Sequence, residues 1–129
     1  MSYAAIKTAL EQQLQSAADI PVVFDDSRYR KKPKTAFLRA IFKPEKVQSR
    51  LIGAAAPAEY QGALEVLIFE ASHMAAVVRA DDLRGAFPKG LLLEQGGVRV
   101  SITGADLVRD QQSLNHNVYR LRIRWRSYF

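Results

Sequence analysis

Residues 119–126 read Tyr119-Arg120-Leu121-Arg122-Ile123-Arg124-Trp125-Arg126, close to the C-terminal end of a chain of 129 residues. Because successive side chains of a β-strand point to opposite faces, this alternation predicts a strand with four arginines on one face. The other face, apolar and aromatic, must enter a core. The arginine face stays in solvent unless acidic groups meet it. What that face meets is therefore the main functional question that the sequence poses.

Two amphipathic helices are predicted around this strand. The first covers about residues 3–18, where Tyr3, Ile6, Leu10, Leu14 and Ala17 recur at helical spacing and Ser2 is placed as the N-cap. The second begins after Ser72 and runs to about Phe87, and Pro88 and Gly90 end it. Its apolar stripe consists of Ala76, Ala80, Leu83 and Phe87.

Branched and aromatic residues predict the remaining strands. We expect them at residues 22–24, at 35–43 up to Pro44, at 60–69 in a central position, and at 91–93 and 98–102 on either side of a Gly96-Gly97 hairpin turn. A turn at 110–117 leads into the last strand. The order is α-β-β-β-α-β-β-β, which predicts one α+β domain over residues 1–129, with two helices packed on a mainly antiparallel or mixed sheet.

Residues 44–58 have no clear periodicity. Their first half is polar, and Gly53-Ala54-Ala55-Ala56-Pro57 offers no large anchoring side chain. A loop of this length is either functional or a plain hairpin excursion, and both interpretations stay open.

Composition predicts a globular protein. The chain is 48% hydrophobic and 25% charged and has no cysteine, so a disulfide framework is excluded. Lys7 and Glu11 interrupt the apolar residues of the N-terminal region, which argues against a signal peptide. No apolar run approaches the ~20 residues of a membrane-spanning helix. We expect a soluble intracellular domain that has no contact with a membrane.

The net charge of +6 is concentrated in two basic clusters. The candidate interaction residues are Arg28, Arg30, Lys31, Lys32 and Lys34 in one cluster, Arg120, Arg122, Arg124 and Arg126 in the other, and Arg50 between them. Such clusters meet nucleic acid, anionic surfaces or acidic proteins. A solvated arginine face is also tolerable, because charges ~7 Å apart in water repel each other by only about half a kcal/mol.

Recognisable catalytic chemistry is missing from the sequence. His73 and His116 have no partner at ligand spacing, and the neighbours in Asp25-Asp26 and Asp81-Asp82 point apart. Asp106 and Asp110 are expected in a solvated turn, and Gly96-Gly97 lacks the lysine of a phosphate loop. We therefore expect no enzyme, no metal and no cofactor.

A small basic nucleic-acid-binding module is the alternative that composition leaves open. Tyr29 lies among the lysines, and Tyr119 and Trp125 lie on the arginine strand, which fits phosphate contact combined with base stacking. However, Tyr119 and Trp125 face away from the arginines, so the core is the more natural place for them.

The order of several short motifs resembles phage tail terminator-like proteins, a family found at the head-proximal end of long non-contractile tails. The motifs are Ser2-Tyr3-Ala4-Ala5-Ile6, Phe37-Leu38-Arg39 ahead of Pro44, Glu59-Tyr60-Gln61-Gly62, Leu83-Arg84-Gly85-Ala86-Phe87-Pro88, Gly96-Gly97-Val98 and Arg122-Ile123-Arg124-Trp125. The resemblance covers nearly the whole chain. The basic cluster at 28–34 departs from it, because a short proline-containing connection is expected there.

The resemblance implies a structural role in phage or prophage assembly. Tail terminators form a ring, typically hexameric, that caps the finished tail tube, stops further addition of subunits and presents a surface for head joining. The implied partners are further copies of the chain, the tail tube protein and a head-completion or connector protein, with DNA only in transit through the channel. The implied locations are the host cytoplasm during assembly and the virion tail. A related head–tail completion protein is a further alternative.

In that setting the loop at 44–58 would be a long hairpin, mobile in the monomer and ordered by a neighbouring subunit or by the tail tube. The arginine face would be solvated or paired within the chain. Alternatively, it would meet the tube, face the channel, or meet carboxylates of the next subunit such as Glu65 or Glu94. DNA contact is a distant third possibility.

Overall fold

The computed structural model describes residues 2–24, 36–49, 58–109 and 117–128. Within these ranges the elements are α1 (Ser2–Ala17), β1 (Val22–Phe24), β2 (Phe37–Ser49), β3 (Ala58–Glu70), α2 (His73–Ala86), β4 (Leu92–Gln95), β5 (Val98–Arg109) and β6 (Asn117–Tyr128). This order confirms the α+β fold predicted from the sequence. The basic cluster at 28–34 and Arg50 lie outside the described residues, as do Asp110 and His116.

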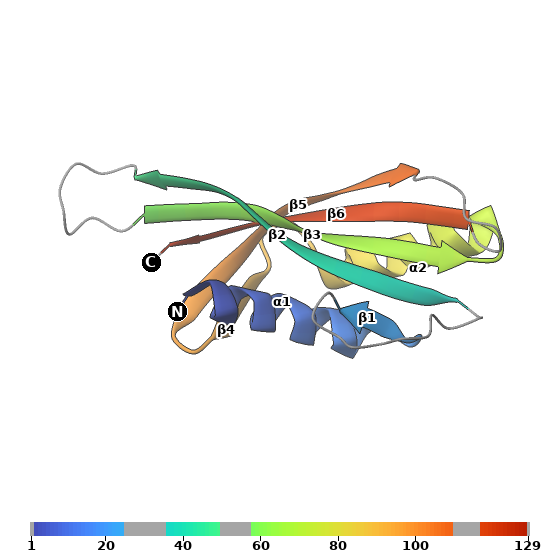
Figure 1. Cartoon of the computed structure of the whole chain (residues 1–129), viewed down its shortest axis with the longest axis horizontal. Helices are drawn as coiled ribbons and strands as arrows, with labels where there is room; N and C mark the ends of the chain where they lie inside the picture. Colours follow the sequence, from blue (N-terminus) through green and yellow to red (C-terminus); the bar gives the residue numbers. More distant parts are fainter. Residues whose placement is uncertain (1, 25–35, 50–57, 110–116, 129) are drawn as a thin grey trace.

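One six-stranded sheet forms the body of the molecule, with the strand order β1-β2-β3-β6-β5-β4 (Figure 1). Neighbouring strands are antiparallel except for β1 and β2, which are parallel. The centre is occupied by β3 and β6, which pair over their whole length from Glu59↔Tyr128 to Glu70↔Asn117. The apolar run of β3 fits this central position, because a strand between two neighbours is buried over most of its surface.

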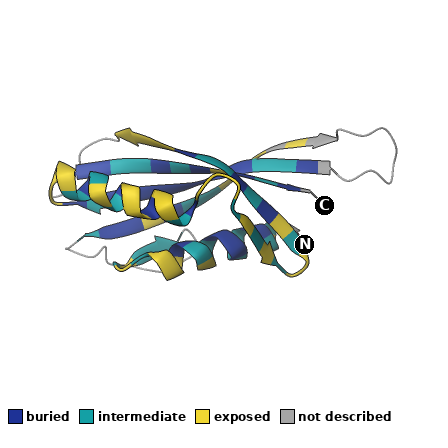
Figure 2. Cartoon of the chain, turned by 180° about the vertical axis from the view of Figure 1, so that it is seen from behind, coloured by how far each residue is buried: buried dark blue, intermediate teal, exposed yellow. Residues whose placement is uncertain are grey.

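Both helices cover the same face of the sheet, as the view from behind shows (Figure 2). Ser72 caps α2 as predicted, because its side-chain oxygen accepts a hydrogen bond from the Ala75 backbone N–H. The predicted stripe of α2 packs on β3 and β6, while the apolar side of α1 packs against α2, β2, β4 and β5, and both helices join one hydrophobic core. The largest buried side chains of this core include Trp125, Phe87, Ile6, Leu10, Leu14, Leu64, Leu121 and Ile123.

The strand predicted to stop at Pro44 continues to Ser49, so residues 44–49 are not part of a loop. Proline is tolerated because β1 pairs only with Leu38–Ala40, so that among the described strands none lies beside Pro44 on this edge, where a missing N–H costs little. A register shift between Pro44 and Lys46 keeps the later residues paired with β3. The strand boundary predicted at Pro44 is therefore wrong, whereas the pairing of Ser49 with Ala58 agrees with the hairpin interpretation of residues 44–58; residues 50–57 lie outside the described part.

The strand predicted at 98–102 is also longer, because β5 continues to Arg109 and places Asp106 inside a strand instead of a solvated turn. A register shift between Ile102 and Gly104 interrupts the alternation of buried and exposed residues. Because of this shift, residues 103–109 do not continue the alternation of residues 98–102, and a strict period of two does not identify them as part of the same strand.

Candidate functional site

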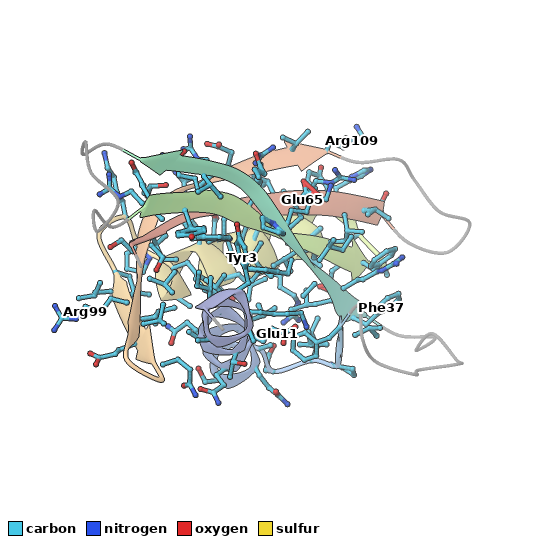
Figure 3. All side chains as sticks on the ribbon, turned by 60° about the vertical axis from the view of Figure 1, so that its left-hand side comes forward. Tyr3, Glu11, Phe37, Glu65, Arg99 and Arg109 are labelled. Atoms are coloured by element: carbon cyan, nitrogen blue, oxygen red, sulfur yellow. The ribbon has the colours of Figure 1, made fainter. Side chains whose placement is uncertain are left out.

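The face of the sheet opposite the helices carries most of the charged strand residues, and we call it the charged face. It consists of Arg39, Lys43, Glu45, Glu59, Glu65, Asp106, Arg120, Arg122, Arg124 and Arg126. Figure 3 shows Glu65 on the ribbon of the central strands. Strand alternation places Leu121, Ile123 and Trp125 on the opposite, helix-covered side, where they are buried.

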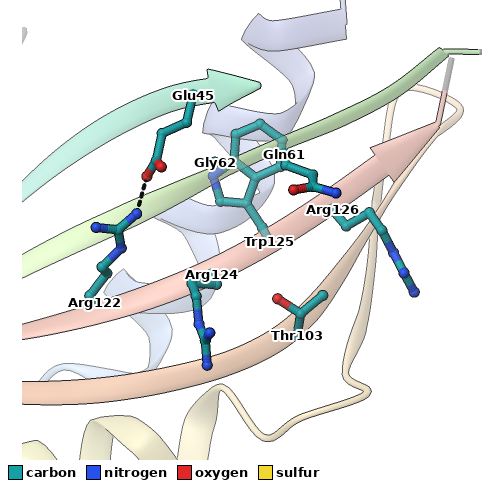
Figure 4. A pocket seen from close by; sticks show the side chains of 8 residues that line it. All are labelled: Glu45, Gln61, Gly62, Thr103, Arg122, Arg124, Trp125 and Arg126. Carbon is teal, nitrogen blue, oxygen red and sulfur yellow. Dashed lines mark hydrogen bonds and ion pairs between the residues drawn. The ribbon is translucent and has the colours of Figure 1, made fainter. Parts of the chain in front are cut away.

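Each of the four β6 arginines contacts a carboxylate from another strand of the same chain. Arg120 Nη1 lies 3.4 Å from Glu65 Oε1 and Oε2, Arg124 Nη2 lies 3.5 Å from Asp106 Oδ2, and Arg126 Nε lies 3.8 Å from Glu59 Oε1. Arg122 Nη2 bonds Glu45 Oε1, the pair drawn in Figure 4. The carboxylates come from β2, β3 and β5. The acidic groups that the sequence analysis required are thus supplied by the chain's own sheet.

Most of these pairs are diagonal neighbours in the sheet. Arg120 stands opposite Leu67 and reaches Glu65 two residues away, while Arg124 stands opposite Gly104 and reaches Asp106. Diagonal positions are ~7–8 Å apart at the backbone, a distance that an arginine side chain spans easily. The arginines of β6 and the carboxylates of β2, β3 and β5 therefore form a network of ion pairs on one face of the sheet.

Glu65 is the centre of this network. Its side chain is only 5% exposed, and its Oε1 forms an ion pair with Lys43 Nζ at 2.6 Å and accepts a hydrogen bond from Arg120 Nη1. A buried carboxylate without a counter-charge would be costly, so the two cations compensate for its removal from water. Glu59 is also buried, and its Oε1 accepts a hydrogen bond from Gln61 Nε2 at 3.0 Å.

Two glycines make room for large side chains. A Cβ on Gly104 would lie 2.5 Å from Arg124 Nη2, which means that this arginine lies flat across the β5 backbone. A Cβ on Gly62 would lie 2.4 Å from the Lys43 carbonyl oxygen and 2.5 Å from Trp125 Cζ2. The indole of Trp125 therefore packs directly on the β3 backbone, and it also stacks on Phe42 with ring centroids 5.5 Å apart.

A shallow pocket of about 310 Å³ opens among these residues (Figure 4). Its lining is Glu45, Gln61, Gly62, Thr103, Arg122, Arg124, Trp125 and Arg126. The cations and the amide offer hydrogen-bond donors to an acidic group, and Glu45 offers an acceptor to a basic one.

The structure places the other singled-out residues as follows. Glu94, considered as a partner for the arginines, lies on β4 with one carboxylate oxygen 3.9 Å from Arg99 Nε across the hairpin. His73 Nδ1 lies 3.2 Å from Tyr119 Oη, and its Nε2 lies 3.3 Å from Arg109 Nη2. Among the residues described, no group of three or more histidines and carboxylates is arranged to hold a metal ion. None of the described helices has the length and hydropathy to cross a membrane.

Four members of the charged face were not predicted from the sequence: Lys43, Glu45, Glu59 and Asp106. In the sequence, a charged residue at any of these positions is indistinguishable from an ordinary surface residue. The only available signal was the alternation of β3 itself, which puts Glu59, Gln61, Ala63 and Glu65 on one side. Pairing that side with the arginines requires knowledge of which strands are neighbours.

Comparison with known proteins supports the fold. No protein-family model matches the chain, and no curated protein matches it. A solved structure of another protein is similar over 100% of this chain and 97% of that chain, with 21% sequence identity and a TM-score of 0.80. At this level of identity the similarity shows a shared α+β fold and carries no function.

Proposed function

We propose that this protein is a phage or prophage tail terminator: it forms a ring, with six copies expected, on the head-proximal end of a tail tube, stops tube growth and offers a surface for head joining. The proposal rests first on the ordered motifs that resemble this family. These motifs fall on α1, β2, β3, α2, the β4–β5 hairpin and β6, and so involve nearly every element of the fold.

The observation that carries the proposal further is the charged face. Its arginines are matched with carboxylates across four adjacent strands, which leaves an extended surface of alternating charge instead of one basic patch. Such a surface favours oriented association with other protein surfaces, because paired charges give specificity and register more than raw affinity.

The same pairing weakens the alternative of a nucleic-acid-binding module. The charge of an arginine that contacts Glu45, Glu59, Glu65 or Asp106 is already partly compensated, so the arginine adds less to the affinity for a phosphate than an unpaired one would. The aromatic side chains proposed for base stacking offer little help, since Trp125 is buried on the other side of the sheet.

The first test is the mass of the protein in solution. Native mass spectrometry across protein concentration and salt, on nuclease-treated samples, should detect closed multimers of about six copies, and negative-stain images should show rings. A monomer that also fails to bind the ends of tail tubes, and whose affinity for a polyanion falls steeply with salt, would overturn the proposal in favour of nucleic-acid binding. Tube binding without any effect on tube length would indicate a head–tail completion protein instead.

A further inference from the structure

In the described part of the chain, β2 and β5 each have an edge that is only partly covered by a neighbouring strand, and the two strands run in opposite directions. The outer edge of β2 is covered by β1 only at Leu38–Ala40. On the other side, β4 covers β5 only at Val98–Ser101, and the backbone bonds of Ile102 to Gly90 and Leu91 extend that cover by one residue. Among the described residues, no strand lies beside β2 from Ile41 onward or beside β5 from Thr103 onward.

The direction of these two edges permits one simple kind of self-association. Each step from β2 through β3 and β6 to β5 is antiparallel, so β2 and β5 run in opposite directions. A second copy placed beside the first, with its helices on the same side, therefore brings its β2 antiparallel to the β5 of its neighbour. Both edges then find hydrogen-bond partners, and the sheet continues from one copy into the next.

The side chains at the two edges favour one register between β2 of one copy and β5 of the next. With Lys43 opposite Asp106, Ile41 stands opposite Val108 on the charged face and Phe42 opposite Leu107 on the helix-covered face. Leu107 and Val108 are 36% and 57% exposed, which is unusual for apolar residues on a free edge. The pairing would cover both of them with apolar partners.

The charges of this register also fit. Within one copy Asp106 contacts Arg124, and Lys43 contacts Glu65. When Asp106 of one copy lies opposite Lys43 of the next, the ion pairs of both copies become continuous across the contact between them. Opposite charges at directly facing positions stabilise an antiparallel strand pair.

We propose that copies of this chain associate head to tail by pairing residues Ile41–Lys43 of β2 with Asp106–Val108 of β5. The paired segment is short, because Pro44 lacks an N–H and the register shift after it ends the regular edge of β2. This inference therefore rests on the proposed function, in which the ring holds the copies next to each other. So short a contact is weak alone and forms where copies are already held side by side. Because the two edges differ, the contact is heterologous and generates a ring when the rotation closes.

Cysteine cross-linking tests the proposal directly, since the chain has no cysteine of its own. Directly opposite residues of antiparallel strands have Cα atoms about 4.5–5.5 Å apart, within the range that a disulfide spans. We would prepare Ile41→Cys and Val108→Cys as single variants and as one double variant. These substitutions keep both positions apolar and leave the ion pairs intact.

Under mild oxidation, at concentrations where native mass spectrometry detects multimers, an equal mixture of the two single variants should give disulfide-linked dimers. Neither single variant alone should do so, and the double variant should give a ladder beyond the dimer. The control mixes Ile41→Cys with Met74→Cys, since Met74 is 73% exposed on α2, and should give only background cross-linking.

The outcomes separate this contact from the proposed function. Multimers without the mixed disulfide overturn the edge pairing and leave the ring proposal standing. Strong cross-linking of Val108→Cys with itself also overturns it, in favour of a symmetric contact between two β5 edges. Absence of multimers under every condition, with tail tubes included, overturns both proposals.

Discussion

At the scale of single residues, Gly62 shows how tightly the centre of the sheet is packed. The indole of Trp125 occupies the space where a side chain at position 62 would lie, and the Lys43 carbonyl of the neighbouring strand closes the other side. Neither group is a flexible chain end that moves away at little cost. A single methyl group at this position therefore forces a shift of β2 or of the stacked Phe42–Trp125 pair.

We expect Gly62→Ala to destabilise the protein by about 1–3 kcal/mol through overpacking. Gly85→Ala is the matched control with the opposite sign, because nothing lies within 4 Å of its Cβ position on helix α2. That variant should be more stable by up to about 1 kcal/mol, since alanine is the better helix former. Urea unfolding of both variants measures the difference, and a neutral Gly62→Ala would contradict the packing.

Glu65 offers a second test at this scale. Replacing it by glutamine keeps the shape but leaves Lys43 and Arg120 without the carboxylate that they share. Hydrogen bonds to a charged group contribute roughly 1.5–3 kcal/mol each, and the partial exposure of both cations reduces this, so we expect Glu65→Gln to cost about 1–3 kcal/mol.

Glu94→Gln is the control for this substitution, because that carboxylate is 63% exposed and 3.9 Å from its partner. Its expected effect is within about 0.5 kcal/mol. Equal urea midpoints for the two variants would show that the buried position of Glu65 has no energetic consequence.

At the scale of elements, Arg79 joins three of them. From α2 its Nη1 bonds Asp19, which follows α1, and its Nε lies 3.4 Å from Glu70 Oε2 at the end of β3. The hydrogen bond from Arg79 and its positive charge lower the pKa of Asp19 below the ordinary value of 3.8. The helices are thus tied at the end of the sheet by a group whose charge depends on pH.

Because the pKa of Asp19 is lower in the folded state, its contribution is complete above pH 3.8 and is lost as the pH falls through the folded-state value. Asp19→Asn should therefore lower the urea midpoint slightly at neutral pH, and the difference from the wild-type protein should disappear in strong acid. The effect is small, since Asp19 is highly exposed. Asp82→Asn, at an exposed position on α2, is the control, and an identical pH profile would contradict the assignment.

At the scale of the whole molecule, the charged face and the helix layer divide the surface into two sides of different chemistry. The ring proposal assigns association to the sheet and its edges, so a change of charge there should weaken assembly while the core stays intact. The core depends on the opposite faces of the same strands, where Leu121, Ile123 and Trp125 are buried.

The double variant Arg122→Ala/Arg124→Ala should keep its fold, because partly exposed ion pairs contribute only about 0–1 kcal/mol each. We expect its multimers, measured by native mass spectrometry, to dissociate at lower salt than those of the wild-type protein. Lys7→Ala/Arg84→Ala removes the same net charge from the helix layer and serves as the control. Equal assembly of both double variants would show that the arginines act only within the chain.

The charge pattern of the sequence predicts a candidate interaction surface but does not predict which residues contact the arginines. Arg120, Arg122, Arg124 and Arg126 were identified as one face because strand alternation is a local property. Their partners Glu45, Glu59 and Asp106 were not predicted, because they are distant in the sequence. They lie 77, 67 and 18 residues before the arginines that they contact, respectively. Long-range pairing has no signature in local periodicity.

The sequence by itself determined the elements whose signals are local: both helices with the Ser72 cap, the Gly96-Gly97 hairpin, the central apolar strand and the amphipathic strand β6. It failed where a register shift breaks the period, at Pro44 and at Ile102–Gly104, because a bulge is defined by the partner strand. Only the tertiary structure decided the strand order, and with it which carboxylates neutralise the arginines and which edges stay free. The physical reason is that helix caps and strand alternation are set by neighbours in sequence, whereas ion pairs and sheet edges are set by neighbours in space.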